Sequence, residues 1–454
     1  MDLLYQLVTI CAARSLIEDW GANAIISTGP WAEVVHITKI TDKTRVPVLS
    51  LATSQPLTAV PKPYLFRLSN SASGYITCLT NLVKLYNWRR LIVLYEDDDY
   101  GSTSASIIPR LNDALQAVGS EICRHVAFPP FESLTDPKAM VHQELKLLKA
   151  QLCTVYIVVR WSSPSMAIEI FKEATTLGMM AKDHVWITGD DVTTLLDSTF
   201  TPSFISSYMQ GVIGIKSYFD DSRKSYHDFS AKFQRRFQEE YSVLGETIFQ
   251  PGMYALQAYD AIHVIAQART KHTLLEGVQS TDLVGLSGRV QFGRNGDLVE
   301  GKGSSVFQVI NVVGRSYKEL GFWLNETWFY RDGREMDRGG MKADSLGPVY
   351  WPGGSSKLPG GWRKLRIGVP TMSHLLVRVE YNANGKHVSG FCIDVFNMTL
   401  ALLNYELSYE FFPFNGSYSE LVAHVPEVKI FSVYFSCYNR IGSFVVEMDT
   451  STQT

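Results

Sequence analysis

The sequence predicts an α/β protein in which parallel sheets are flanked by helices. Over the first 250 residues, short apolar runs alternate with stretches of helical periodicity. The runs are apolar on both faces, as in residues 154–159 (Thr-Val-Tyr-Ile-Val-Val). Such strands are typical of sheets buried between two layers of helices. The length of 454 residues allows two or three domains.

The elements follow in order along the chain. The helices are expected at residues 3–19, 31–40, 73–86, 102–118, 137–150 and 164–177. The strands are expected at residues 23–27, 46–51, 90–95, 121–128, 154–159 and 184–188.

Composition and motifs exclude several classes of function. The formal net charge is -3, so no basic field points to nucleic acid. The ten histidines are scattered without the spacing of metal ligands. The phosphate-loop, dinucleotide-binding, zinc-protease and nucleophile-elbow motifs are all missing. We therefore expect a protein that is not an enzyme and has no catalytic residues, metal site or cofactor.

The chain shows no clear targeting or membrane segment. The first residues include Asp2 and Gln6 and do not have the basic start of a signal peptide. No run of 18 apolar residues occurs, so we expect no transmembrane span. Among the six cysteines, Cys123 and Cys153 lie near the starts of successive strands. They are either a disulfide pair or two buried thiols.

Several motifs occur in the order found in the type I periplasmic binding protein fold. They are the segments 46–58 (Val-Pro-Val-Leu-Ser-Leu-Ala-Thr-Ser-Gln-Pro-Leu-Thr), 64–68 (Tyr-Leu-Phe-Arg-Leu), 87–101, 178–187, 252–261, 287–298 and 321–323. The chain thus resembles a two-lobed clamshell of this fold, and 178–187 is similar to the version in plant receptors.

A second resemblance begins at residue 364. Residues 364–370 (Lys-Leu-Arg-Ile-Gly-Val-Pro), 389–396 (Ser-Gly-Phe-Cys-Ile-Asp-Val-Phe) and 405–414 (Tyr-Glu-Leu-Ser-Tyr-Glu-Phe-Phe-Pro-Phe) predict a strand, a loop, a helix and a second strand. They resemble the start of the ligand-binding module of plant ionotropic glutamate receptor-like proteins. Phe391, Val395 and Leu402 are spaced for the core face of that helix.

The resemblance implies a domain plan. Residues 1–330 form a receptor ligand-binding domain that lacks its first strand-helix-strand block, and residues 331–362 form a Gly- and Pro-rich linker. Residues 363–424 form part of the second module, and residues 425–454 are a divergent tail.

The resemblance also implies the function. The chain is expected to be the extracellular amino-acid-sensing part of a ligand-gated cation channel of the plasma membrane. Without pore helices, it should carry no channel activity alone. The alternatives are a soluble amino-acid-binding or decoy subunit and a non-functional fragment of a receptor gene. The partners are an amino acid such as glutamate and other receptor subunits, bound through lobe one as homo- or hetero-oligomers.

The candidate ligand-binding residues lie in loops at the carboxyl ends of expected strands, where open α/β lobes bind ligands. They are Ser27, Thr28, Thr53, Ser54, Trp161, Ser162, Asp190 and Asp191. The hydroxyls suit the carboxylate of an amino acid and the acids suit its ammonium, while Trp161 could cover the ligand. Each also has a structural interpretation, as a helix cap, a turn residue or a core side chain.

Glycosylation is expected at the Asn-x-Ser/Thr sequons of Asn325 and Asn415, if the chain is secreted. Asn397 also begins a sequon, but it lies within a helical pattern.

Overall fold

A computed structural model shows how these elements are arranged. The chain divides into two compact units, Met1–Gly361 and Trp362–Thr454. The structure describes residues 2–29, 31–52, 62–69, 72–96, 104–159, 161, 164–198, 200–241, 250–299, 306–324, 329, 346–361, 365–371, 378–382, 385–402, 409–416 and 420.

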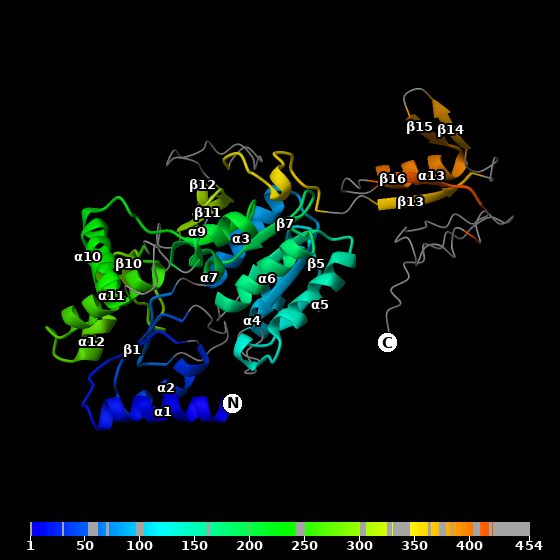
Figure 1. The fold of residues 1–454 in the computed structure, drawn as a ribbon. Coiled ribbons are helices and arrows are strands. Elements are labelled where there is room, and N and C mark those ends of the chain that lie inside the picture. The colour runs from blue at the N-terminus through cyan, green and yellow to red at the C-terminus, as the bar shows by residue number, and fades with distance from the viewer. Residues whose placement is uncertain are drawn as a thin grey trace. The chain divides into compact units, whose positions relative to one another are not determined.

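The first unit contains two sheets, each with its own helices, and we call these two parts lobe one and lobe two. Lobe one comprises the described residues within 2–69 and 224–299, and lobe two those within 72–217 and 306–361. The chain passes between the lobes three times (Figure 1). The first crossing follows the carboxyl end of the last strand of the lobe-one sheet, Leu65–Arg67. The second follows the carboxyl end of a lobe-two strand, Ile213–Ser217.

Lobe two is built on a seven-stranded sheet with the order β12-β11-β8-β7-β6-β4-β5. Strands β4 to β8 pair in parallel, and β11 pairs antiparallel with both β8 and β12. The strands are β4 (Arg90–Glu96), β5 (Glu121–Phe128), β6 (Val155–Val159), β7 (Val185–Thr188), β8 (Ile213–Ser217), β11 (Val306–Val313) and β12 (Ser316–Leu324).

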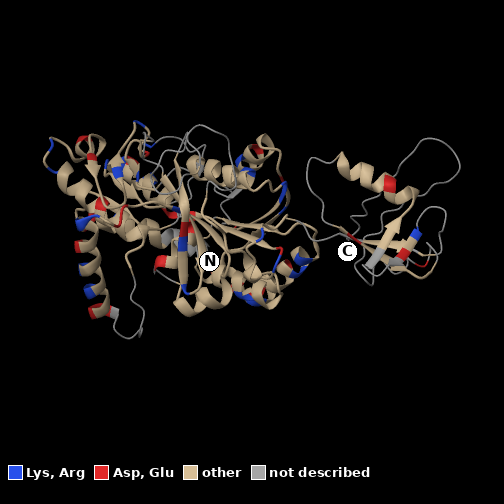
Figure 2. Cartoon of the chain, turned by 90° about the horizontal axis from the view of Figure 1, so that it is seen from above, with Lys and Arg blue, Asp and Glu red and all other residues tan. Residues whose placement is uncertain are grey.

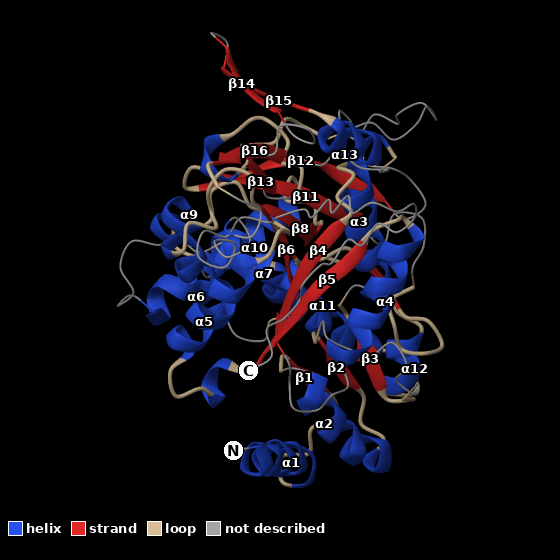
Figure 3. Cartoon of the chain, turned by 90° about the vertical axis from the view of Figure 1, so that its right-hand side faces the viewer, coloured by secondary structure: helices blue, strands red, loops and turns tan. Residues whose placement is uncertain are grey.

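Helices cover both faces of this sheet, as Figure 3 shows. Alternation along β6 explains why, because successive side chains of a strand point to opposite faces. Ile157 belongs to the core that includes α3 (Ala72–Leu85) and α4 (Ser104–Ala117). Tyr156 belongs to the core that includes α5 (Pro137–Ala150) and α6 (Pro164–Thr176). The uninterrupted apolar run therefore fills two cores.

Lobe one has a smaller parallel sheet of three strands in the order β1-β2-β3. Its first part comprises α1 (Asp2–Glu18), β1 (Ile25–Ser27), α2 (Trp31–Thr44), β2 (Val48–Ser50) and β3 (Leu65–Arg67). Among the described strands, β1 pairs only with β2 and is therefore an edge strand.

Elements from much later in the sequence complete lobe one. These are α10 (Lys224–Tyr241), α11 (Met253–Ala268), α12 (Leu274–Gln279), β9 (Asp282–Val284) and β10 (Arg289–Gln291). Val264 of α11 and Val278 of α12 pack with Leu49 and Phe66 of the sheet. Figure 1 shows these green helices close to the blue amino-terminal elements.

Short helices connect the larger elements of lobe two. They are α7 (Asp190–Thr193), α8 (Leu195–Ser198), α9 (Pro202–Tyr208) and the 3-10 turns Phe131–Ser133 and Pro352–Gly354.

Residues 346–361, within the stretch predicted as a linker, pack across lobe two, and we call them the strap. Trp351 is 2% exposed, and its ring lies 5.8 Å from that of Trp88. The indole Nε1 of Trp88 donates to the Pro359 carbonyl at 3.0 Å. The backbone N–H of Thr154 donates to the Gly361 carbonyl at 3.1 Å. Trp88 and Thr154 precede β4 and β6, so the strap lies at the amino-terminal edge of the sheet.

The second unit contains the predicted strand, helix and strand. They are β13 (Leu365–Pro370), α13 (Phe391–Ala401) and β16 (Tyr409–Phe414), with β13 and β16 paired in parallel. The polar loop between them also contains a hairpin that we did not predict, formed by β14 (Arg378–Asn382) and β15 (Gly385–Ser389).

The predicted core face of α13 is wrong. Phe391 is 57% exposed and Leu402 is 83% exposed. The helix instead packs on the sheet through Cys392, Ile393 and Phe396. The helix is apolar on more than one side, so periodicity alone did not identify the buried face.

The structure confirms the predicted α/β fold class. All the expected helices and strands are present, although their bounds differ by a few residues. Cys123 and Cys153 are free thiols that donate to the carbonyls of Leu91 and Arg90, each at 3.1 Å.

Candidate functional site

The candidate residues of lobe two lie at the carboxyl ends of β6 and β7. Trp161 follows β6, and its side chain packs on Phe128 with ring centroids 5.7 Å apart. It is only 8% exposed, so most of its surface belongs to the core. Its indole Nε1 is buried and has no hydrogen-bond partner within the described part of the chain. The backbone N–H of Trp161 donates to Asp191 Oδ2 at 2.5 Å.

Asp190 opens the short helix α7, and Gly189 precedes it as the N-cap. Its two carboxylate oxygens accept hydrogen bonds from the backbone N–H and the hydroxyl of Ser217, each at 2.6 Å. Burial raises the pKa of Asp190, although the Ser217 bonds and the charge of Lys216 act in the opposite direction. Asp190 therefore joins the ends of β7 and β8.

Asp191 is half-buried, and its Oδ2 accepts the hydrogen bond from the Trp161 backbone N–H. The structure thus brings Trp161 and Asp191 together across the ends of adjacent strands. A carboxylate at this edge can attract the ammonium group of a ligand.

Sequence reasoning missed a buried charged cluster beside these residues. Lys216 Nζ lies 2.5 Å from Asp197 Oδ2 and 2.9 Å from the Tyr317 hydroxyl, which donates to Asp197 at 2.6 Å. Burial lowers the pKa of Lys216, but Asp197 and Tyr317 outweigh it, so the pKa is raised. Burial raises the pKa of Tyr317 to about 12. The three groups satisfy one another, which indicates a structural role.

In lobe one, the predicted residues lie at the end of β1. Ser27 is 5% exposed, whereas Thr28 is exposed. Thr53, Ser54, Ser162 and Asn325 lie outside the described residues. Ser27 pairs in register with Ser50 of β2, and Ser50 pairs with Arg67 of β3. The carboxyl-terminal edge of this sheet therefore carries two hydroxyls and a guanidinium in one row.

Arg67 was not among the predicted site residues. It forms an ion pair with Asp297 through Nη2, and its backbone N–H donates to the Gly296 carbonyl at 2.8 Å. Its Cζ lies 6.0 Å from the centre of the Trp31 ring. Burial lowers the pKa of Arg67 to about 10, so the group remains charged at neutral pH. A charged residue ending the apolar segment 64–66 was the signal that could have identified it.

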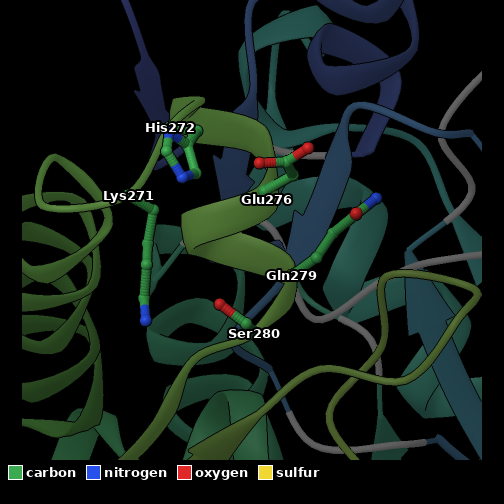
Figure 4. Close-up of a pocket in the computed structure, with 5 residues that line it drawn as sticks. All are labelled: Lys271, His272, Glu276, Gln279 and Ser280. Atoms are coloured by element: carbon green, nitrogen blue, oxygen red, sulfur yellow. The ribbon is translucent and has the colours of Figure 1, made fainter.

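A surface depression in lobe one lies away from these strand ends, at the turn from α11 to α12. Figure 4 shows its lining residues, which are Lys271, His272, Glu276, Gln279 and Ser280. All five are exposed, and α12 is only six residues long. Nothing in this arrangement selects a ligand.

Among the described residues, no group of three or more His, Cys, Asp or Glu side chains could hold a metal ion. No helix in this part of the chain has both the length and the apolar character needed to cross a membrane.

Charge is mixed over the surface of the first unit. Figure 2 shows basic and acidic segments interspersed along its helices. A neutral or zwitterionic ligand suits this distribution better than a polyanion does.

The chain matches a known family and several known proteins. Residues 6–314 match the family model "Receptor family ligand binding region". Glutamate receptor 2.2 of Arabidopsis thaliana is 31% identical, and the match covers 91% of this chain and 48% of that protein. Glutamate receptor 2.7 of the same plant is 27% identical, with 95% and 47% covered. The chain thus spans about half the length of these relatives, which are receptors.

Solved structures show the same fold. A leucine-binding protein, LivK, from Thermotoga maritima has a TM-score of 0.52 and 17% identity, over 70% of this chain and 84% of that one. A solute-binding protein of an ABC transporter from R. palustris, in complex with benzoate, has a TM-score of 0.54 and 13% identity, over 72% and 84%. Because the family model covers more than half of its 454 residues, the chain belongs to the receptor ligand-binding-region family and is related to the plant glutamate receptors.

Proposed function

We propose that the first unit binds a free amino acid between its two lobes. The observation that supports this is the chemistry of the strand ends. Lobe one presents the hydroxyl of Ser27, and lobe two presents the half-buried carboxylate of Asp191. A zwitterion of a few ångströms offers a carboxylate to the first and an ammonium to the second. Leucine binding by a protein of the same fold supports the same ligand class.

Calorimetric titration of the 454-residue chain with each of the twenty amino acids tests this proposal. We expect saturable one-to-one binding of at least one of them. Asp191→Asn keeps an oxygen that can accept the Trp161 N–H bond but removes the charge, so affinity should fall roughly tenfold or more. Asp228→Asn, at an exposed position of α10, is the matched control and should bind as the wild type does. No binding at millimolar concentration by a folded chain would refute the proposal.

We further propose that this binding serves an extracellular receptor of the plasma membrane that gates a cation channel. The relation to glutamate receptors supports the proposal. Asn415 is exposed at the end of β16, where a glycan would have access. When a plant cell secretes the chain, a glycan on Asn415 should slow its migration in gel electrophoresis. Endoglycosidase treatment should abolish this mobility shift, and Asn415→Gln should abolish it as well. A chain that stays unglycosylated and intracellular would contradict this location.

We also propose that lobe one carries the contact with other receptor subunits. The end of α1 and the following turn expose apolar side chains, with Leu16 45% and Trp20 80% exposed. Exposed apolar groups of this size favour protein contacts when they cluster. Sedimentation of the wild type and of Leu16→Glu tests this. A monomeric wild type at high micromolar concentration would refute self-association through this surface.

A further inference from the structure

The polar row in lobe one has unused hydrogen-bond donors. Ser27, Ser50 and Arg67 pair in register on adjacent parallel strands, which lie about 4.8 Å apart. Residues two positions before them (Ile25, Val48 and Leu65) all belong to the core beside α2. Side chains two apart on a strand share a face, so the three polar groups also lie on the α2 side.

The donors in this row can be counted. Ser50 Oγ accepts from the Ala52 N–H at 3.2 Å, so its own O–H is free to donate. Within the described residues, the structure gives the Ser27 hydroxyl no partner. Arg67 uses Nη2 for Asp297, but its Nη1 is buried and has no hydrogen-bond partner among those residues. The Arg67 side chain is 10% exposed.

An unpaired buried guanidinium nitrogen costs free energy unless something accepts its protons. Two hydroxyls and one guanidinium end are donors, and a carboxylate is an acceptor with about four sites. The match is therefore between the side-chain row and one carboxylate group.

We propose that Arg67, with the hydroxyls of Ser27 and Ser50, anchors the α-carboxylate of the bound amino acid in lobe one. This inference rests on the proposed amino-acid binding. Arg67 Nη1 donates to the carboxylate while Nη2 remains on Asp297, so Asp297 holds the guanidinium in place. Arg67 is then a specificity-determining residue that selects ligands with a free carboxylate.

The test asks whether the preference for a ligand with a free carboxylate depends on Arg67. It uses the amino acid that binds most tightly in the titrations above and the same amino acid as its α-carboxamide. We expect the wild type to prefer the carboxylate form by at least tenfold. Arg67→Lys keeps a positive charge near Asp297 but loses the second nitrogen, so this preference should fall tenfold or more.

Asp297→Asn is the matched control for a purely structural role. It weakens the tether of Arg67 and lowers the unfolding temperature, but it retains Nη1, so most of the carboxylate preference should remain. If Arg67→Lys keeps the full wild-type preference, the proposal is wrong, even when both variants are less stable.

A second measurement separates this inference from the proposed function. Should no amino acid bind, acetate is the probe. At constant ionic strength, acetate in place of chloride should raise the unfolding temperature of the wild type and leave that of Arg67→Lys unchanged. Equal shifts in the two proteins would overturn the assignment of Arg67.

Discussion

Lobe one and lobe two share the alternation of strand and helix but differ in how completely their sheets are enclosed. Lobe two has seven strands with a helical layer and an apolar core on each face. Lobe one has three described strands in its main sheet, and β1 is an edge strand. Trp20, which follows α1 in lobe one, is 80% exposed, whereas Trp186 of lobe two is fully buried. We therefore expect lobe two to be the more rigid lobe and lobe one the more adaptable one.

The strap strengthens this difference, because it belongs to lobe two alone. The Asn311 side chain of β11 donates to the Tyr350 carbonyl at 3.0 Å and accepts from the Tyr350 N–H at 2.8 Å. The strap therefore joins β11 to the starts of β4 and β6. Gly353 needs its positive φ of 72° here, where it lies against the backbone at Lys182. We expect the strap to hold the amino-terminal edge of the sheet together.

Replacing Trp351 should cause the largest loss of unfolding free energy. If it does not, the proposed difference in stability between the two lobes is wrong. Trp351→Ala removes a buried ring that packs edge-on against Tyr86 and Trp88, at a cost of about 3–5 kcal/mol of unfolding free energy. Hydrogen exchange should accelerate in β4 and β6 but not in β1 to β3. Leu358→Ala, at a strap residue that is 41% exposed, is the control and should change little. Equal acceleration in both lobes would argue against a strap specific to lobe two.

Breaking the buried ion pair of lobe two should cause the second largest loss of stability. Lys216→Ala leaves Asp197 charged and largely buried, which should cost about 3 kcal/mol in urea unfolding. The double variant Lys216→Met, Asp197→Leu should recover much of that loss, because no charge remains without a partner. If the double variant is as unstable as the single one, apolar packing at this site matters more than charge.

A pH titration compares one buried acid in each lobe. Asp190 accepts two bonds from Ser217, and Asp260 accepts from the Ser287 N–H at 2.7 Å and its hydroxyl at 2.6 Å. Burial raises the pKa of both acids above the ordinary 3.8. The folded state therefore binds more protons between 3.8 and the raised pKa, and stability falls as the pH rises through that window.

The measurement is the unfolding free energy of the wild type relative to Asp190→Asn or Asp260→Asn. This difference should be largest below pH 3.8, fall as the pH rises, and then become constant. A difference that rises with pH for either residue would show that hydrogen bonds outweigh burial in that lobe.

The smallest effect is expected at an exposed ion pair of lobe one. Arg289 and Asp282 lie on paired strands, with Nη2 and Oδ2 2.7 Å apart, and both side chains are about half exposed. Water and salt screen such pairs, so Arg289→Ala should not change the unfolding temperature measurably. A clear loss of stability would mean that the β9–β10 hairpin is more important to lobe one than its exposure suggests.

Part of the candidate site could be proposed from sequence, because open α/β lobes place ligands at strand ends. That rule identified the regions of Ser27, Trp161 and Asp191. It did not identify Arg67 or Ser217, which matter through their partners on other elements. Ser217 and Asp190 are 27 residues apart in the chain, and their bond forms only when β7 and β8 lie side by side.

The sequence by itself determined the order of helices and strands and the family, because apolar periodicity and motif order are local properties of the chain. Only the tertiary structure decided which polar groups meet. Ser27, Ser50 and Arg67 form one row because the register of three strands aligns them, and register depends on contacts between distant segments. Likewise, the composition of residues 346–361 predicts a linker. In the structure, Trp351 is buried in the core of lobe two, so these residues pack on that lobe as the strap.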